Sequence, residues 1–193
     1  MRIAIIGSHG VGKTTLSVKL SDYFGFARIP DIVREAHEKK FIINEETPPE
    51  SQFWILSKMI ELERNTLESW IADKTLFDNI IYGNVILKDQ KVKDVIADIV
   101  IKEARYDVML YLPIEFAIAD DGLRSLNAEF QAQIDRSYIE FLDKNNFQYQ
   151  IVRGTVEERF QQALQIIEPL LRPSSQDESA NGLPEELVEE AII

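Results

Sequence analysis

The chain has 193 residues, of which 45% are hydrophobic and 28% charged, and this suits one α/β domain with a full core. The formal net charge of −12 argues against a general nucleic-acid binder, and the absence of cysteine excludes disulfides and thiolate metal sites. No apolar run of about 18 residues is present, and Met1 leads directly into an apolar segment. We therefore expect a cytoplasmic protein with no signal peptide and no membrane contact.

The first fifteen residues carry a motif with a defined chemistry. The apolar run 2–6 predicts a buried strand, and the residues after it fit the P-loop pattern G-x-x-x-x-G-K-[ST]. In such a loop, backbone N–H groups surround a phosphate, the lysine reaches the outer phosphates and the threonine hydroxyl joins the Mg²⁺ shell. We therefore predict a site for ATP and Mg²⁺. The residues expected to contact the nucleotide are Gly7, Ser8, His9, Gly10, Val11, Gly12, Lys13, Thr14 and Thr15.

Strands and helices are predicted to alternate along the rest of the chain. Apolar runs predict further strands over 26–30, 75–78, 107–112 and 147–152. Helical spacing of apolar residues predicts helices over 13–24, 31–40, 48–72, 80–87, 91–104, 129–144 and 155–171. Thr155 and Glu158 fit a capping box at the start of the last helix.

This alternation predicts an α/β fold of the P-loop NTPase type, a three-layer α/β/α structure with a five-stranded parallel sheet. Ligands bind such sheets at the carboxyl ends of the strands, where we expect the P-loop, Asp31 and Asp78 to meet. We place one domain at 1–172. The tail 173–193 contains six acidic residues and no lysine or arginine, and its composition predicts disorder.

The segment 120–126, Asp-Asp-Gly-Leu-Arg-Ser-Leu, the Gln- and Asp-rich helix after it and the helix start at 155–159 carry a family resemblance. They resemble the P-loop nucleoside and nucleotide kinases, most of all the ribosylnicotinamide kinase domain of NadR-type proteins and the AAA-labelled ATP-binding domains related to it. The resemblance spans about 1–171. It implies that 120–126 is a lid over the ATP phosphates and that Arg124 is catalytic. It also matches Asp31, an acid ending the second strand, with Arg34 three residues later.

One departure from the family pattern concerns the third strand. Nucleotide-kinase relatives commonly show Asp-Arg after it, and the NadR-type domain shows a further acid two residues on. With the strand placed at 75–78, this chain has Asp78-Asn79-Ile80, which lacks both the arginine and the extra acid. The departure leaves the acceptor open.

Each candidate site residue has a structural alternative. Asp78 is interpreted as a ligand of the Mg²⁺ shell, the Walker-B role, or else as a helix N-cap. Asp31 would take the proton of the acceptor hydroxyl, or cap the helix after it. Arg34 would bind acceptor or phosphate oxygens, or lie in solvent. His9 is expected to be an exposed loop residue and not a catalyst.

The function that we predict is an ATP-dependent kinase acting on a nucleoside-like or nucleotide-like small molecule. Lys13 and Arg124 would neutralise charge, Thr14 and Asp78 would hold Mg²⁺, and Asp31 would orient the acceptor. The alternative is a regulatory or non-catalytic ATP-binding NTPase. The Asn-Lys-x-Asp motif that a GTPase uses to read guanine is absent, and the chain is too short for the extra helical domain of a remodelling ATPase. We expect neither nucleic acid nor membrane as a partner, and leave homodimer formation open.

Overall fold

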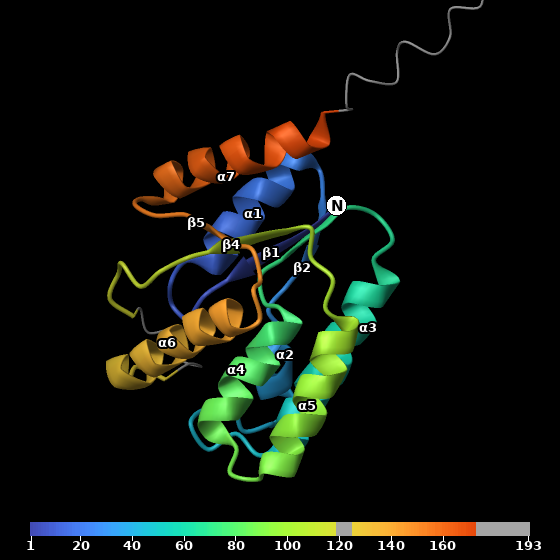
Figure 1. Cartoon of the computed structure of the whole chain (residues 1–193), viewed down its shortest axis with the longest axis vertical. Coiled ribbons are helices and arrows are strands. Elements are labelled where there is room, and N and C mark those ends of the chain that lie inside the picture. The colour runs from blue at the N-terminus through green and yellow to red at the C-terminus, as the bar shows by residue number, and fades with distance from the viewer. Residues whose placement is uncertain (119–124, 173–193) are drawn as a thin grey trace, which may run out of the picture.

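The computed structural model describes residues 1–118 and 125–172, and shows a central parallel sheet between two layers of helices (Figure 1). The strand order is β2-β3-β1-β4-β5, and all pairs are parallel. This confirms the predicted fold class. The strands are β1 (Arg2–Ile6), β2 (Ala27–Ile29), β3 (Trp70–Ala72), β4 (Val108–Tyr111) and β5 (Gln150–Ile151).

The helices divide into two layers that cover opposite faces of the sheet (Figure 1). One face packs against α1 and α7, and the other packs against the group from α2 to α6. The helices are α1 (Lys13–Phe24), α2 (Val33–Glu38), α3 (Pro49–Asn65), α4 (Leu76–Ile86), α5 (Gln90–Glu103), α6 (Ala128–Lys144) and α7 (Val156–Leu171).

The central strand β1 is apolar on both sides because both of its faces are covered. Ile3 and Ile5 pack with α1 and α7, whereas Ala4 and Ile6 pack with the other helical layer. All four side chains are fully buried. This alternation extends to the neighbouring strands and decides on which face each polar residue at a strand end lies.

The prediction of a strand over 75–78 is wrong, and so is the prediction of a helix reaching residue 72. Helix α3 ends at Asn65, and the third strand is the fully buried run Trp70–Ala72, which pairs with β1 and β2. Residues 76–78 open helix α4, where the buried carboxylate of Asp78 accepts hydrogen bonds from the Thr75 backbone N–H (2.8 Å) and hydroxyl (3.1 Å). Asp78 therefore stabilises a helix start and does not end a strand.

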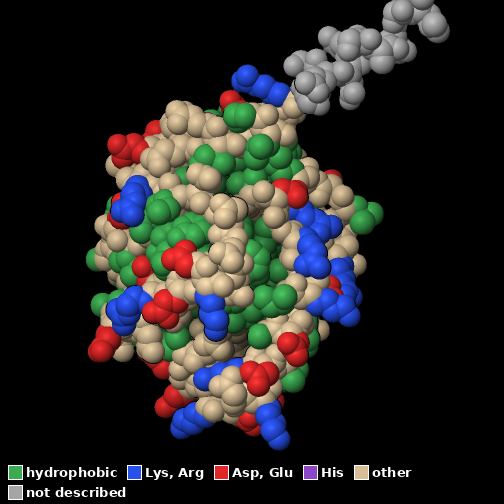
Figure 2. All heavy atoms as spheres, in the orientation of Figure 1, with side chains coloured by type: hydrophobic (Ala, Val, Ile, Leu, Met, Phe, Trp, Pro, Cys, Tyr) green, Lys and Arg blue, Asp and Glu red, His purple; other side chains and the backbone are tan. Residues whose placement is uncertain are grey.

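Two segments discussed above fall outside the described residues: most of the predicted lid, including Arg124, and the predicted acidic tail 173–193. The predictions for both therefore remain untested. Within the described residues, no helix is long and apolar enough to cross a membrane. On the face seen in Figure 2, acidic and basic side chains are interspersed, apart from a small basic group at the right.

A buried carboxyl group lies under the start of α4. Glu63 of α3 is 7% exposed and accepts a hydrogen bond from the Tyr106 hydroxyl (2.8 Å), which in turn accepts one from the Leu76 N–H (2.9 Å). Burial raises the pKa of Glu63 from 4.5 to about 7, against the smaller opposing effects of Tyr106 and Arg2. The folded protein therefore favours the neutral carboxyl group.

This shift makes stability depend on pH. The raised pKa stabilises the fold fully below pH 4.5, and this contribution is lost as pH rises to about 7. The loss is at most about 3 kcal/mol. We expect Glu63→Gln to flatten this dependence, measured as the free energy of unfolding in urea at pH 5 and pH 8. Glu61→Gln, on the exposed side of the same helix, is the control; equal pH slopes in all three proteins would contradict the prediction.

Candidate functional site

The P-loop connects β1 to α1 and closely approaches the neighbouring strand. Gly7 has φ 135°, and a Cβ atom at this position would lie 2.5 Å from the Leu112 carbonyl oxygen. Gly10 and Gly12 also have positive φ, at 74° and 93°. Only glycine adopts such conformations without strain, and they turn successive peptide groups around a concave backbone surface.

The start of α1 completes an anion-binding cradle. Gly12 is the N-cap and offers no side-chain cap to the helix N–H groups. The Lys13 ammonium donates to the carbonyl oxygens of Gly7 (2.9 Å) and Ser8 (2.7 Å), so it lies across the loop. Thr14 and Thr15 are exposed at the helix start. Uncapped N–H groups beside a lysine and a threonine hydroxyl fit the triphosphate of a nucleotide and its Mg²⁺.

Two buried side chains hold the P-loop from outside. The Gln131 amide of α6 donates to the His9 carbonyl oxygen (2.6 Å), and the Arg159 guanidinium of α7 donates to that of Val11 (2.5 Å). Sequence reasoning missed both, although Arg159 lies in the helix start that supported the family resemblance. The only feature of the sequence that could have identified them is a polar residue at a helix position that the apolar pattern places on the buried side.

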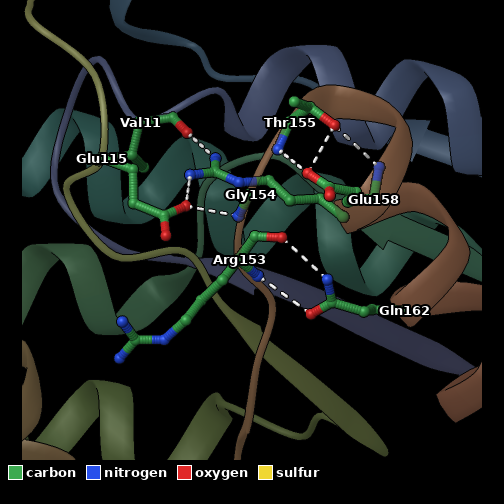
Figure 3. A network of polar contacts seen from close by, with 8 residues as sticks. Val11, Glu115, Arg153, Gly154, Thr155, Glu158 and Gln162 are labelled. Atoms are coloured by element: carbon green, nitrogen blue, oxygen red, sulfur yellow. Dashed lines mark hydrogen bonds and ion pairs between the residues drawn. The ribbon is translucent and has the colours of Figure 1, made fainter.

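Arg159 also joins the P-loop to the chain after β4. It forms an ion pair with Glu115 (2.6 Å), whose carboxylate accepts a further hydrogen bond from the Gly154 N–H (2.8 Å) (Figure 3). The hydrogen bond from Arg159 holds the pKa of Glu115 below its usual value. Next to this network, the predicted capping box of Thr155 and Glu158 is confirmed (Figure 3).

His9 is buried, contrary to our expectation of an exposed loop residue. It is 5% exposed, and its Nδ1 lies 3.2 Å from the Tyr82 hydroxyl oxygen. Its ring packs beside that of Phe130, with 5.8 Å between centroids. The P-loop therefore contacts α4 and α6 directly through this side chain.

A pocket adjoins the P-loop at His9, on the sheet face covered by α2 to α6. It encloses an empty volume of about 570 Å³, part of which is open to solvent. Its lining is mainly apolar with a few polar groups, the usual character of a small-molecule site. The lining residues are His9, Val33, Ile43, Asn44, Thr47, Gln52, Ile55, Lys74, Asp78, Asn79, Tyr82, Ile86, Ser125 and Phe130.

Two buried amides could contact a molecule in this pocket. Gln52 is 4% exposed and Asn79 is 1% exposed. The Asn79 Oδ1 atom has no hydrogen-bond partner within the described residues, while its Nδ2 makes one long contact of 3.4 Å to the Leu76 carbonyl oxygen. A buried acceptor without a partner is unfavourable by about 1–3 kcal/mol, so it marks a position suited to a ligand donor.

The acid that directly follows the third strand is Asp73, and Lys74 comes next. Because the strand lies earlier than we predicted, Lys74 stands where the nucleotide-kinase pattern has arginine, and Thr75 stands where the NadR-type pattern has the further acid. Asp73 lies on the same sheet face as Ile71, which packs with α1, and its carboxylate is 3.9 Å from Arg28 on that face. Asp78 lies on the opposite face, in the pocket lining.

The structure does not bring Asp31 and Arg34 into the pocket lining. The Asp31 carboxylate accepts a hydrogen bond from the Val33 N–H (2.9 Å) at the start of α2, beside the pocket. Arg34 is exposed on that helix.

A further carboxylate near Lys13 was missed. Asp135 of α6 accepts a hydrogen bond from the Tyr111 hydroxyl (2.8 Å) at the end of β4. Burial raises its pKa, and the positive charge of Lys13 acts in the opposite direction. No cluster of three His, Asp or Glu side chains that could hold a metal occurs in residues 1–118 and 125–172.

Comparison with solved structures shows the same fold. Deoxyadenosine kinase from M. mycoides, with the products dCMP and dCDP bound, has a TM-score of 0.70 at 21% identity, over 88% of this chain and 100% of the other. NadR in complex with NR gives 0.74 at 17% identity, over 87% of this chain and 50% of NadR. Thymidylate kinase from Ehrlichia chaffeensis gives 0.61 at 17% identity, over 86% and 98%. At these identities the similarity establishes the fold alone.

No curated protein matches the chain. The family model AAA_28, described as an AAA domain, matches residues 2–159, which include the P-loop, the residues after β3 and the start of α7. The chain thus belongs to the AAA_28 family of P-loop domains.

Proposed function

We propose that this protein is an ATP-dependent kinase that transfers the γ-phosphoryl group to a hydroxyl group of a nucleoside-like metabolite. The observation that carries the proposal is the position of the pocket, which shares His9 with the P-loop. A molecule in the pocket would lie next to the end of a triphosphate held by the loop. Phosphoryl transfer depends mainly on such positioning and on charge neutralisation.

The pocket favours an uncharged acceptor. Its charged lining residues, among those described, are Lys74 and Asp78, which carry opposite charges. The remaining polar groups are amides, hydroxyls and the His9 imidazole. A nucleoside offers N–H and O–H donors for these groups and an apolar ring for the rest of the lining. A nucleotide would bring a phosphate dianion that the described lining does not balance.

The proposed roles follow from position. Lys13 neutralises charge on the transferring group, and Asp31, beside the pocket, orients the acceptor hydroxyl or takes its proton. Thr14 and Asp73 hold the Mg²⁺ shell, since both lie on the α1 side of the sheet. When bound, the metal neutralises charge on the phosphates. Arg124 keeps the lid role that the resemblance implies. The position of the pocket does not support the hypothesis that Arg34 binds acceptor or phosphate oxygens, because Arg34 is not among the lining residues.

A regulatory or non-catalytic NTPase is less well supported. The sequence feature that favoured it was the absence of an arginine after the strand-end acid, which the sequence placed at Asp78. The acid after the third strand is Asp73, and the Lys74 next to it supplies a positive charge at that position, which weakens this argument against catalysis.

A screen of ATP consumption against nucleosides and nucleoside monophosphates tests the proposal. We expect a phosphorylated nucleoside as product, and Lys13→Ala should lower turnover at least about 100-fold, or about 2.7 kcal/mol. Lys19→Ala is the control on the same helix, because Lys19 pairs with Glu157 at the surface. ATP hydrolysis without a phosphorylated acceptor would instead support an NTPase, and a protein that binds no ATP would refute both.

The two candidate metal acids can be separated by substitution. Asp73→Asn should reduce Mg²⁺-dependent turnover at least about tenfold, which corresponds to about 1.4 kcal/mol. Asp78→Asn should mainly lower the melting temperature, because it weakens the cap of α4. Turnover titrated with Mg²⁺ and thermal unfolding of both variants distinguish these outcomes. The opposite pattern would restore Asp78 to the metal site.

Asn79 provides a test of the pocket. Asn79→Leu removes the acceptor without a partner, so we expect an equal or higher melting temperature of the free protein. The kcat/KM for the nucleoside should fall at least about tenfold, with the KM for ATP unchanged. Asn84→Ala, at an exposed position of the same helix, should change neither. If Asn79→Leu keeps normal nucleoside kinetics, the acceptor does not contact this amide.

A further inference from the structure

The P-loop is held at two carbonyl oxygens by side chains of separate helices. Gln131 of α6 donates to the His9 oxygen, and Arg159 of α7 donates to the Val11 oxygen. Both side chains are buried, at 3% and 2% exposed. Each hydrogen bond joins positions more than a hundred residues apart in sequence, so neither arises from local chain geometry.

A planar trans peptide links each carbonyl to the next amide. Within one such unit the C=O and the N–H point in opposite directions. Holding the His9 carbonyl therefore fixes the direction of the Gly10 N–H, and holding the Val11 carbonyl fixes that of the Gly12 N–H. Both glycines have the positive φ that the concave loop requires. The two side chains thus determine where two phosphate-binding donors point.

The contacts of Arg159 suit this task better than simple core packing. Its second guanidinium nitrogen pairs with Glu115 (2.6 Å), and the central carbon of its guanidinium group lies 4.8 Å from the centroid of the Phe116 ring. A cation this deeply buried needs a counterion and a fixed geometry, and here the geometry is directed at the loop backbone.

We propose that Gln131 and Arg159 are positioning residues that hold the Gly10 and Gly12 amides toward the phosphates of ATP, and so set ATP affinity. The inference rests on the proposed ATP site and adds the residues that pre-organise it. This role requires no contact between either side chain and the nucleotide. They act through the loop backbone, which they hold in the binding conformation before ATP arrives.

The experiment compares variants that perturb the same helices with and without a P-loop contact. Gln131→Leu and Arg159→Met remove the two donors. Asn127→Ala and Thr155→Ala remove the caps at the starts of α6 and α7. These two side chains are far less directly connected to the loop. Binding of a non-hydrolysable ATP analogue is measured by calorimetry, together with melting temperature. We expect at least about tenfold weaker binding in the first pair and nearly normal binding in the second.

Conservative variants keep the test informative if the first pair unfolds. Arg159→Lys retains a donor for the Val11 oxygen and should restore part of the affinity. Gln131→Glu can donate to the His9 oxygen only when its carboxyl group is protonated, so any affinity that it restores should fall as pH rises.

A spectroscopic measurement tests the amides directly. The chain has eight glycines, so selective ¹⁵N-glycine labelling gives a simple amide spectrum. The Gly10 and Gly12 signals should shift in the free Gln131 and Arg159 variants, and should not shift in the two cap variants.

The inference would be overturned if the cap variants lost as much ATP affinity as the Gln131 and Arg159 variants for the same drop in melting temperature. The two helices would then act on the loop only through overall stability. Normal affinity in folded Gln131 and Arg159 variants would overturn it as well. If the wild-type protein binds no ATP analogue, the proposed function fails, which is a different result.

Discussion

A loop can present its amides to a phosphate only if the carbonyls of the same peptides find partners elsewhere. In this protein the carbonyls of Gly7 and Ser8 accept from Lys13, and those of His9 and Val11 accept from Gln131 and Arg159. The loop's own Lys13 meets this requirement for only two of these four carbonyls. The donors to the His9 and Val11 carbonyls come from α6 and α7, so the phosphate cradle depends on the completed three-layer fold.

The same fold separates two kinds of chemistry by the alternation of side chains along buried strands. In β3, Trp70 and Ala72 face the pocket side, whereas Ile71 faces α1. Asp73 follows the direction of Ile71 and its carboxylate lies 3.9 Å from Arg28, while Lys74 lines the pocket. A shift of one residue in this short strand would exchange the acid and the base between the two faces.

Sequence patterns predicted the P-loop, most helices and the sheet class, because these depend on local spacing and on long apolar runs. The third strand was misplaced because it has three residues, too few for a periodic signal, and follows a long helix after only a short connection. The run at 76–78 resembled a strand end, yet the Thr75–Asp78 hydrogen bonds make it a helix start. That one error also compared the family's Asp-Arg pattern with Asp78-Asn79 instead of Asp73-Lys74.

The remaining omissions share a physical cause. Gln131 and Arg159 lie on amphipathic helices, where a polar residue usually faces solvent, and their partners are backbone atoms more than a hundred residues away. His9 is buried because Tyr82 and Phe130 lie against it, and both come from helices that sequence cannot place beside the loop. Local pattern identifies a motif, whereas long-range contacts determine the surroundings of each of its residues.

His9 also indicates how the phosphate cradle and the pocket are connected. Its backbone carbonyl is held by Gln131 while its ring lines the pocket beside Tyr82. A molecule that fills the pocket would touch this ring, and the peptide group that carries it also directs the Gly10 amide. Acceptor binding and phosphate binding would then share one rigid residue. Such sharing favours a productive arrangement of the two substrates, because displacement of the His9 backbone would disturb both sites at once.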